Sequence, residues 1–511
     1  MRMKRLGWTL AWAMWCLWAF CVPARAQDTG AAGGGTGHIE ASVVKVFSTV
    51  RYPDVYHPWT KQTPHDISGT GVVIEGNRIL TNAHVVLYAS QIQIQANQAG
   101  DKLPATVEAI DPGIDLAILK LDNDAFFRRH PPLARAGALP DVKDTVLAYG
   151  FPTGGTSLSI TKGIVSRVEF TNYNFPVSGL RIQVDAPINP GNSGGPAVVN
   201  DKMIGLVFSK LVNAENIGYI IPNEEIELFL QRVAAGQTGK PMMLDGLQTL
   251  ENSGMRQYLH LPDDVRGIVV NRPARTDPDY PLHQWDVITR IGDTPINDQG
   301  MVDLNDHLQV NFRYMIQRLV HNGLLPLTVV RGGKTLQIQL PVPTHRDMLI
   351  PSLDGSYPSY FVYGPLVFTR ATREFLAFVN GSPQLAVRLA LLKSPLMTRL
   401  ADTPTPERQD LVVVASPNFP NRLSEGYSSM AGFVVKSVNG IPVRSLANLV
   451  SILRDLRDEF VVFEFDSNEG ETQVYRREDV LKATDDILSD NGVRSQGSPD
   501  MMQIWQGRAK P

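Results

Sequence analysis

Residues 69–86 read GTGVVIEGNRILTNAHVV, a pattern that is typical of short paired strands. Two short apolar runs are divided by Gly76-Asn77, a pair that favours a tight turn between two strands. Similar runs recur at intervals of roughly ten residues, reading QIQIQAN, DLAILKL, DTVLAYGF, GIVSRVEF, LRIQVDA, KMIGLVFS and IGYIIP. Helical periodicity is nearly absent before Pro222, so the pattern predicts a β-sandwich or a β-barrel.

The composition predicts a globular chain of several domains. It has 511 residues, of which 43% are hydrophobic and 19% are charged, which is too long for one ordinary core. Its formal net charge is −3, and residues 1–26 carry four basic and no acidic residues, so the remainder carries −7. This charge argues against a nucleic-acid partner. Both cysteines, Cys16 and Cys21, lie in the first 26 residues, so no disulfide is expected in a processed chain.

Residues 1–26 have the pattern of a secretion signal. A basic start precedes an apolar run over 6–22, and Ala24-Arg25-Ala26 forms a small-x-small cleavage site. The alternative is an uncleaved anchor, because the run is long for a signal, although it is short for a membrane span. We expect an exported protein, periplasmic in a bacterium, with no stable membrane span after cleavage.

The rest of the chain divides into modules. We expect a flexible linker over 27–38, an all-β domain over 39–236 closed by a helix at 224–234, and a linker reading GQTGKP at 236–241. WDVITRIGDTPINDQGMVDL (285–304) and AGFVVKSVNGIPVRSLANL (431–449) share one pattern, which indicates two copies of a small module. The expected boundaries are 245–343 and 401–485, with a connector at 344–400 and a polar tail at 486–511.

Ser193 is the candidate nucleophile. It lies in Pro190-Gly191-Asn192-Ser193-Gly194-Gly195-Pro196, where the glycines allow the amides of Gly191 and Ser193 to turn toward one point beside the hydroxyl. GNSGG also satisfies the G-x-S-x-G elbow of α/β-hydrolases. That elbow requires its Asp and His after the serine, whereas here the suitable residues come earlier.

His84 and Asp115 supply a base and an orienting carboxylate. Each lies at the end of an apolar strand, where a histidine or an acid is often structural. The order His, Asp, Ser, with separations of 31 and 78 residues, is the order of chymotrypsin and differs from that of subtilisin.

Several motifs together resemble the Deg/HtrA family of trypsin-fold proteases. They are TNAHVV, DLAILKL and GNSGGP, with GIVS before the serine and NIGYIIP after it. Tyr56-His57-Pro58-Trp59 and the two-module tail are closer to the plant-type Deg branch. The resemblance implies a mainly β chain, a chymotrypsin-type double β-barrel followed by two PDZ-like α+β domains. It also implies His84 as base, Asp115 as orienting acid, Ser193 as nucleophile, and oxyanion donors at Gly191 and Ser193.

The first PDZ-like module is expected to bind an extended peptide at a sheet edge, with Gly267, Ile268 and Val269 forming the loop and strand. It departs from the family at Trp285, where a glycine is typical. The second module has no clear carboxylate loop, so we interpret it as a degenerate copy with a packing role.

The specificity pocket is expected to be apolar. Trypsin-like enzymes select basic residues with an aspartate six positions before the nucleophile, and here that position is Pro187, followed by Ile188. With Leu206 on the wall strand, the pocket should accept Val, Ala, Leu or Ile. The alternative is that these residues pack the second barrel.

The resemblance further implies an ATP-independent endopeptidase that cleaves unfolded or damaged exported proteins, assembled as a trimer or hexamer. The alternative is a chaperone or peptide-binding scaffold with little proteolysis. No metal-binding or dinucleotide pattern occurs, so no cofactor or metal is implied.

Overall fold

The computed structural model describes residues 36–507 apart from 97–99, 175, 211–216 and 468–469. The expected secretion signal and most of the expected flexible linker therefore lie outside the described residues. Within those described ranges, no helix is both long and apolar enough to cross a membrane.

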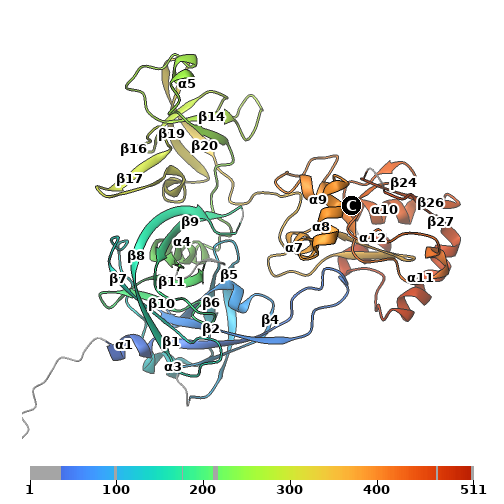
Figure 1. Cartoon of the computed structure of the whole chain (residues 1–511), viewed down its shortest axis with the longest axis horizontal. Coiled ribbons are helices and arrows are strands. Elements are labelled where there is room, and N and C mark those ends of the chain that lie inside the picture. Colours follow the sequence, from blue (N-terminus) through green and yellow to red (C-terminus); the bar gives the residue numbers. More distant parts are fainter. Residues whose placement is uncertain (1–35, 97–99, 175, 211–216, 468–469, 508–511) are drawn as a thin grey trace, which may run out of the picture.

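Twelve strands form two closed barrels, as Figure 1 shows at its lower left. The first has the strand order β1-β2-β3-β6-β5-β4. Its strands are β1 (Val43–Val50), β2 (His65–Ile74), β3 (Arg78–Thr81), β4 (Ala89–Gln95), β5 (Leu103–Asp111) and β6 (Leu116–Lys120). The turn between β2 and β3 passes through Gly76 and Asn77, both with positive φ, as the Gly-Asn pair predicts.

The second barrel has the order β10-β11-β12-β9-β8-β7. Its strands are β7 (Thr145–Gly150), β8 (Ser159–Asn172), β9 (Ser178–Val184), β10 (Pro196–Val199), β11 (Lys202–Lys210) and β12 (Gly218–Pro222). The helices of the barrel domain are α1 (Thr36–Ala41), α2 (Ala83–Val86), α3 (Asp124–Arg129) and α4 (Asn223–Ala234). The mainly β double barrel and the closing helix are thus confirmed.

A shared apolar core joins the two barrels. It contains Val43 and Leu80 from the first barrel together with Met203, Leu206 and Ile221 from the second, all of them fully enclosed. Because this core fixes one barrel against the other, it also fixes the site that lies between them.

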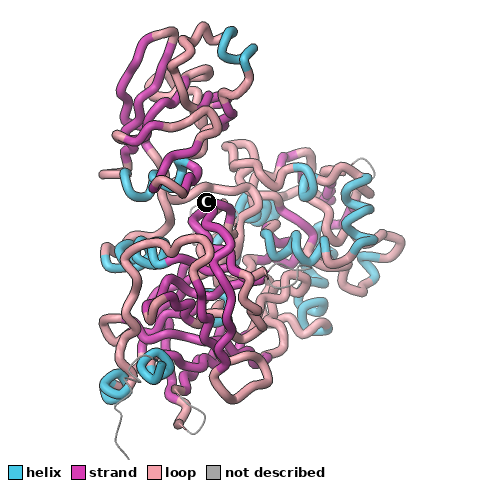
Figure 2. Tube along the Cα trace, turned by 60° about the vertical axis from the view of Figure 1, so that its left-hand side comes forward, coloured by secondary structure: helices cyan, strands magenta, loops and turns pink. Residues whose placement is uncertain are grey.

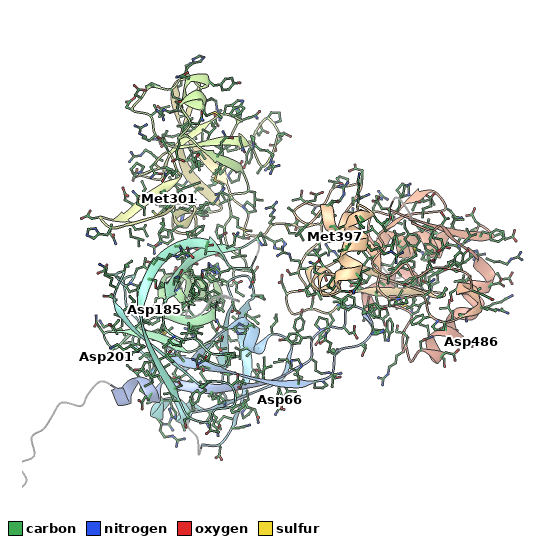
Figure 3. The ribbon with its side chains drawn as sticks, viewed as in Figure 1. Asp66, Asp185, Asp201, Met301, Met397 and Asp486 are labelled. Carbon is green, nitrogen blue, oxygen red and sulfur yellow. The ribbon has the colours of Figure 1, made fainter. Side chains whose placement is uncertain are left out.

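The first module follows α4 and packs on the second barrel. Its elements are β13 (Gly246–Thr249), α5 (Ser253–Tyr258), β14 (Ile268–Arg272), β15 (Val287–Ile291), β16 (Thr294–Pro295), β17 (Met301–Asn305), β18 (Leu308–Asn311), η1 (Phe312–Met315), α6 (Ile316–Leu319), β19 (Leu324–Arg331) and β20 (Lys334–Pro341). The main sheet has the order β13-β14-β15-β19-β20. One apolar cluster runs from the second barrel into this module. In Figure 3, Met301 lies in this module and Asp185 in the barrel domain beneath it.

More than half of the α-helical residues that the structure describes lie in the second module, whose helices are cyan in Figure 2. Its elements are β21 (Tyr360–Tyr363), β22 (Leu366–Arg370), α7 (Arg373–Asn380), α8 (Pro383–Leu391), α9 (Pro395–Thr398), β23 (Val412–Val414), η2 (Arg422–Ser424), β24 (Val435–Val438), β25 (Ile441–Pro442), α10 (Leu446–Asp455), β26 (Phe460–Phe465), β27 (Gln473–Arg476), α11 (Arg477–Asp490) and α12 (Pro499–Trp505).

This module is larger than the predicted range 401–485. Its main apolar core includes Phe361 and Phe368 from the predicted connector and Ile504 from the predicted tail. β22 also pairs with β23 across the intervening helices. Both segments therefore belong to the folded module.

Candidate active site

His84 and Asp115 are brought together by the first barrel. β3 ends at Thr81 and leads into the one-turn helix α2, which carries His84, while Asp115 directly precedes β6. Because β3 and β6 are neighbours in the barrel, the two residues meet at the same end of the sheet.

Two hydrogen bonds hold the pair. Asp115 Oδ2 lies 2.7 Å from His84 Nδ1, and the backbone N–H of His84 donates to Asp115 Oδ1 at 2.9 Å. Asn82 Nδ2 donates to the carbonyl of Asp115 at 2.9 Å. Asp115 has φ of 60°, an uncommon conformation for a residue other than glycine and one that occurs at functional sites. Hydrogen bonds therefore hold both carboxylate oxygens of Asp115 and its backbone carbonyl.

The surroundings of His84 favour the protonated form of its imidazole. Partial burial of the imidazole disfavours its charged form, but the hydrogen bond and the negative charge of Asp115 outweigh burial and raise the pKa of His84 above its ordinary value. The side chain of His84 is 50% exposed and that of Asp115 is 11% exposed, so the imidazole can reach a substrate while the carboxylate stays shielded.

Ser193 comes from the second barrel, in the loop between β9 and β10. Gly69 on β2 separates it from the His84 helix: a Cβ at Gly69 would lie 2.8 Å from Val85 Cγ1 and 3.2 Å from the carbonyl oxygen of Ser193. The absence of a side chain at position 69 thus allows the serine loop to approach α2. In this structure the Ser193 hydroxyl donates to the carbonyl of Phe208 at 3.3 Å. Among the described residues it has no hydrogen bond with His84, and contacts between nucleophile and base are often loose without substrate.

The backbone beside Ser193 offers two free donors. Gly191 has φ of 97°, and a Cβ there would lie 2.5 Å from the carbonyl oxygen of Phe151, so only glycine fits. Among the described residues, the amides of Gly191 and Ser193 have no hydrogen-bond acceptor. The N–H of Thr153 donates to the carbonyl of Pro190 at 2.8 Å, which turns the N–H of the 190–191 peptide to the opposite side. A hydroxyl, an imidazole–carboxylate pair and two free amides are the parts needed for acyl transfer.

The expected pocket residues separate into two groups. Pro187 is exposed, whereas Ile188 is only 7% exposed. The side chain of Ile188 fills the space beside Gly218, because a Cβ on Gly218 would lie 2.2 Å from Ile188 Cδ1. Leu206 is fully buried in the core shared by the two barrels. Its neighbour Val207 shares the apolar cluster of Ile188, since successive side chains on a strand point to opposite faces. Leu206 therefore packs the core, and Val207 is the residue on the side of Ile188.

The expected peptide-binding strand of the first module has no free edge, so this expectation is wrong. Val269 on β14 pairs with Gln248 on one side and with Val287 on the other. Ile268 and Val269 thus lie inside the sheet, and Gly267 directly precedes β14. Within the described residues, the outer edge of β13 is unpaired. In the sequence, the only indication of this edge strand is Gly246 followed by a short run in which apolar and polar residues alternate.

Trp285, which stands where glycine is typical, has φ of 73° and contacts Tyr258 in an edge-to-face arrangement at 5.7 Å. It thus keeps the left-handed conformation for which glycine is usually required.

A cavity of about 830 Å³ lies between α4 and the second module and is lined in part by Asp111, Arg232 and Arg370. No residue of the candidate site lines it.

Comparisons with known proteins agree with this architecture. The family model of the trypsin-like peptidase domain matches residues 69–206, and that of the PDZ domain matches residues 351–500. The second match covers the module that the sequence suggested to be a degenerate copy, together with residues 351–400 of the predicted connector.

Two relatives in Arabidopsis thaliana align over most of the chain. "Protease Do-like 2, chloroplastic" is 32% identical over 472 residues, which are 91% of this chain and 76% of that protein. "Protease Do-like 4, mitochondrial" is 34% identical over 438 residues, which are 82% of this chain and 80% of that protein. Among solved structures, "HtrA-type protease AlgW with decapeptide" is 24% identical with a TM-score of 0.46, covering 60% of this chain and 97% of that one.

Proposed function

The chain belongs to the Do-like, or Deg/HtrA, family of serine endopeptidases, and we propose that it cleaves polypeptides with Ser193 as nucleophile, His84 as general base and Asp115 as orienting acid. The observation that carries this assignment is the pair of hydrogen bonds from Asp115 to the ring and backbone of His84. Such a carboxylate fixes the tautomer of the imidazole and stabilises its charged form after proton transfer.

In the first step, Ser193 Oγ attacks the scissile carbonyl and its proton passes to Nε2 of His84. The resulting oxyanion accepts hydrogen bonds from the amides of Gly191 and Ser193, which have no other acceptor among the described residues. The imidazolium then protonates the leaving amine, and water hydrolyses the acyl-enzyme by the same groups in reverse.

Cleavage should follow small or medium aliphatic residues. Ile188 closes the space beside Gly218, and Val207 adds to the same apolar cluster. Such a surface accepts Ala, Val, Leu or Ile, whereas a Lys or Arg side chain would lose its hydration there. Mass spectrometry of the products of an unfolded protein tests this, since cuts concentrated after Lys or Arg would contradict it.

The substrates we propose are unfolded or damaged exported proteins, cleaved without ATP in the periplasm of a bacterium. The signal pattern of residues 1–26 supports export, and the relatives named as chloroplastic and mitochondrial proteases support a location outside the cytosol. A trimer-based assembly is proposed from the family resemblance, and a monomeric mass in light scattering would contradict it. Peptide addition to the first module, where it occurs, should use the outer edge of β13.

A fluorophosphonate probe tests the catalytic assignment directly. The full-length processed protein should be labelled, and peptide mapping should place the label on Ser193. Ser193→Ala should show no labelling, whereas Ser178→Ala, which changes a serine of β9 in the same barrel, should leave labelling unchanged. A label on any other residue, or no label under any condition that unfolds a substrate, would overturn the proposal and favour the scaffold alternative.

A further inference from the structure

Thr70 on β2 links the first barrel to the loop that carries Ser193. It is fully buried and takes part in four hydrogen bonds. Its N–H donates to the carbonyl of Ser193 at 2.8 Å, and its hydroxyl donates to the carbonyl of Gly191 at 2.7 Å. The hydroxyl accepts from the N–H of Phe151 at 2.8 Å, and the carbonyl of Thr70 accepts from the Thr81 hydroxyl at 2.7 Å.

These contacts hold both ends of the segment that offers the two free amides. Gly191 and Ser193 each turn their carbonyl oxygen toward Thr70. Their own N–H groups are left without an acceptor among the described residues. The orientation of both donors is thus coupled to one residue of the opposite barrel.

Only a hydroxyl can satisfy both side-chain contacts. The N–H of Phe151 is a donor and the carbonyl of Gly191 is an acceptor, so the group between them must accept one hydrogen bond and donate another. Valine has the same shape and can do neither. Serine can do both.

The contact to Phe151 extends to the other side of the 190–191 peptide. Phe151 begins the loop in which the N–H of Thr153 donates to the carbonyl of Pro190. Lys45 of the first barrel also reaches this loop and donates to the carbonyl of Gly155 at 2.7 Å. The Thr70 hydroxyl therefore joins the two segments that fix the 190–191 peptide.

We propose that Thr70 is a positioning residue whose hydroxyl, by joining the carbonyl of Gly191 to the N–H of Phe151, keeps the amides of Gly191 and Ser193 in the geometry that binds the oxyanion, while its backbone N–H holds the carbonyl of Ser193. This inference rests on the proposed function of Ser193. Thr70 does not touch the substrate, and it acts through the backbone of the serine loop. Loss of its hydroxyl should lower the stabilisation of the transition state and leave substrate binding in the ground state unchanged.

Thr70→Val in the full-length protein tests the proposal. We expect kcat on a fluorogenic peptide to fall by about 100-fold, the size of effect seen when one oxyanion donor is lost, with KM changed by less than about threefold. Thr70→Ser should keep kcat within about fivefold of the native protein. A peptidyl trifluoromethyl ketone, whose tetrahedral adduct carries an oxyanion, should lose affinity in parallel with kcat/KM.

Thr369→Val is the matched control. Thr369 is 2% exposed, and its hydroxyl donates to the carbonyl of Ser359 at 2.7 Å in the second module. This variant makes the same chemical change in a buried site far along the chain and should lower Tm without lowering kcat. If Thr70→Val does not fold, Thr70→Ala and Thr70→Ser, which differ by the hydroxyl alone, give the same comparison.

The proposal is overturned if Thr70→Val keeps kcat within threefold, if Thr70→Ser is as slow as Thr70→Val, or if the loss appears equally in Thr369→Val. Probe labelling separates these results from a failure of the proposed function. Native protein that labels at Ser193, together with a fully active Thr70→Val, contradicts only the role of Thr70. Native protein that does not label at Ser193 contradicts both.

Discussion

The two modules are held against the barrels by different chemistry. The first module docks on two carboxylates in the first turn of α4. Glu224 accepts a hydrogen bond from the Tyr314 hydroxyl and pairs with Arg318 at 2.9 Å. Glu225 accepts from Gln317 Nε2 at 3.1 Å. These contacts are charged and directional, and they lie beside the apolar cluster that continues into the module.

The second module contacts the barrel domain through a group of aromatic rings. Trp59, in the loop between β1 and β2, contacts Tyr360 and Phe419, with ring centroids 6.4 and 5.5 Å apart. Tyr56 contacts Phe378 at 5.2 Å in the same way. Figure 1 shows this part of the barrel domain extending toward the second module, and Figure 3 labels Asp66 on that side of the barrels.

Charged contacts and ring contacts respond to different perturbations. A buried charge that loses its partner destabilises the fold strongly, because it cannot be rehydrated. A lost ring costs the apolar area that it covered, and this cost depends little on salt. The first attachment should therefore be sensitive to charge, and the second to the size of the side chain.

Glu225→Gln should have the largest effect on stability. Glu225 is fully buried and pairs with Lys240, which is 7% exposed, at 3.0 Å. The substitution leaves the lysine charge buried without its partner, so we expect a loss of about 3–5 kcal/mol in the free energy of unfolding. Denaturant unfolding of the full chain measures it.

The double variant Glu225→Gln, Lys240→Met is the control for this charge argument. It removes both charges and keeps similar volumes, so it should recover a large part of the lost stability. A single variant within 1 kcal/mol of the native protein, or a double variant that is less stable than the single one, would contradict the charged nature of this attachment.

Trp59→Ala should have the next largest effect, about 2 kcal/mol, because the indole is partly buried against the two rings. The loss should be the same in low and high salt. Tyr258→Ala is the matched control, since that ring is 65% exposed and should cost less than about 0.5 kcal/mol. Equal losses in the two variants would show that Trp59 does not hold the second module.

The pH dependence of hydrolysis should respond to changes in the active site and not to changes in the contacts that hold the two modules. The pKa of His84 is raised by Asp115 against the effect of burial, and the base must be neutral to accept a proton. We therefore expect kcat/KM to fall as the pH drops through a value above the ordinary pKa of histidine. Asp115→Asn should move this acidic limb of the pH–rate profile to lower pH and slow turnover by about 10⁴-fold.

Glu224→Gln and Trp59→Ala should leave the same limb where it is, because neither residue is among the groups that shift His84. A pH–rate profile between about pH 5 and 9 measures all three variants. A limb that moves with either attachment variant would indicate that module docking sets the protonation of His84.

The sequence was informative where the pattern is local. The Gly76-Asn77 turn, the barrel strands and the helix near 224–234 follow from residues close in the chain. The contact between His84 and Asp115 could also be expected, because each lies at the end of an apolar strand and their order is characteristic.

The sequence was less informative where partners are distant. The second module was predicted too short, because β22 pairs with β23 across three intervening helices. The strand at 268–272 was expected at a sheet edge, because local residues cannot show that β13 and β15 occupy both its sides. Local residues also cannot show that Glu225 pairs with Lys240, because that contact depends on the path of the linker that follows α4.

Turnover of an unfolded protein by Ser193→Ala shows whether this serine is the nucleophile. Fluorescently labelled casein should be cleaved by the native full-length protein, and the variant should be slower by at least about 10⁴-fold in kcat/KM, since the nucleophile is removed while the fold is kept. Cleavage by purified Ser193→Ala within tenfold of the native rate would contradict the assignment of Ser193 as the nucleophile.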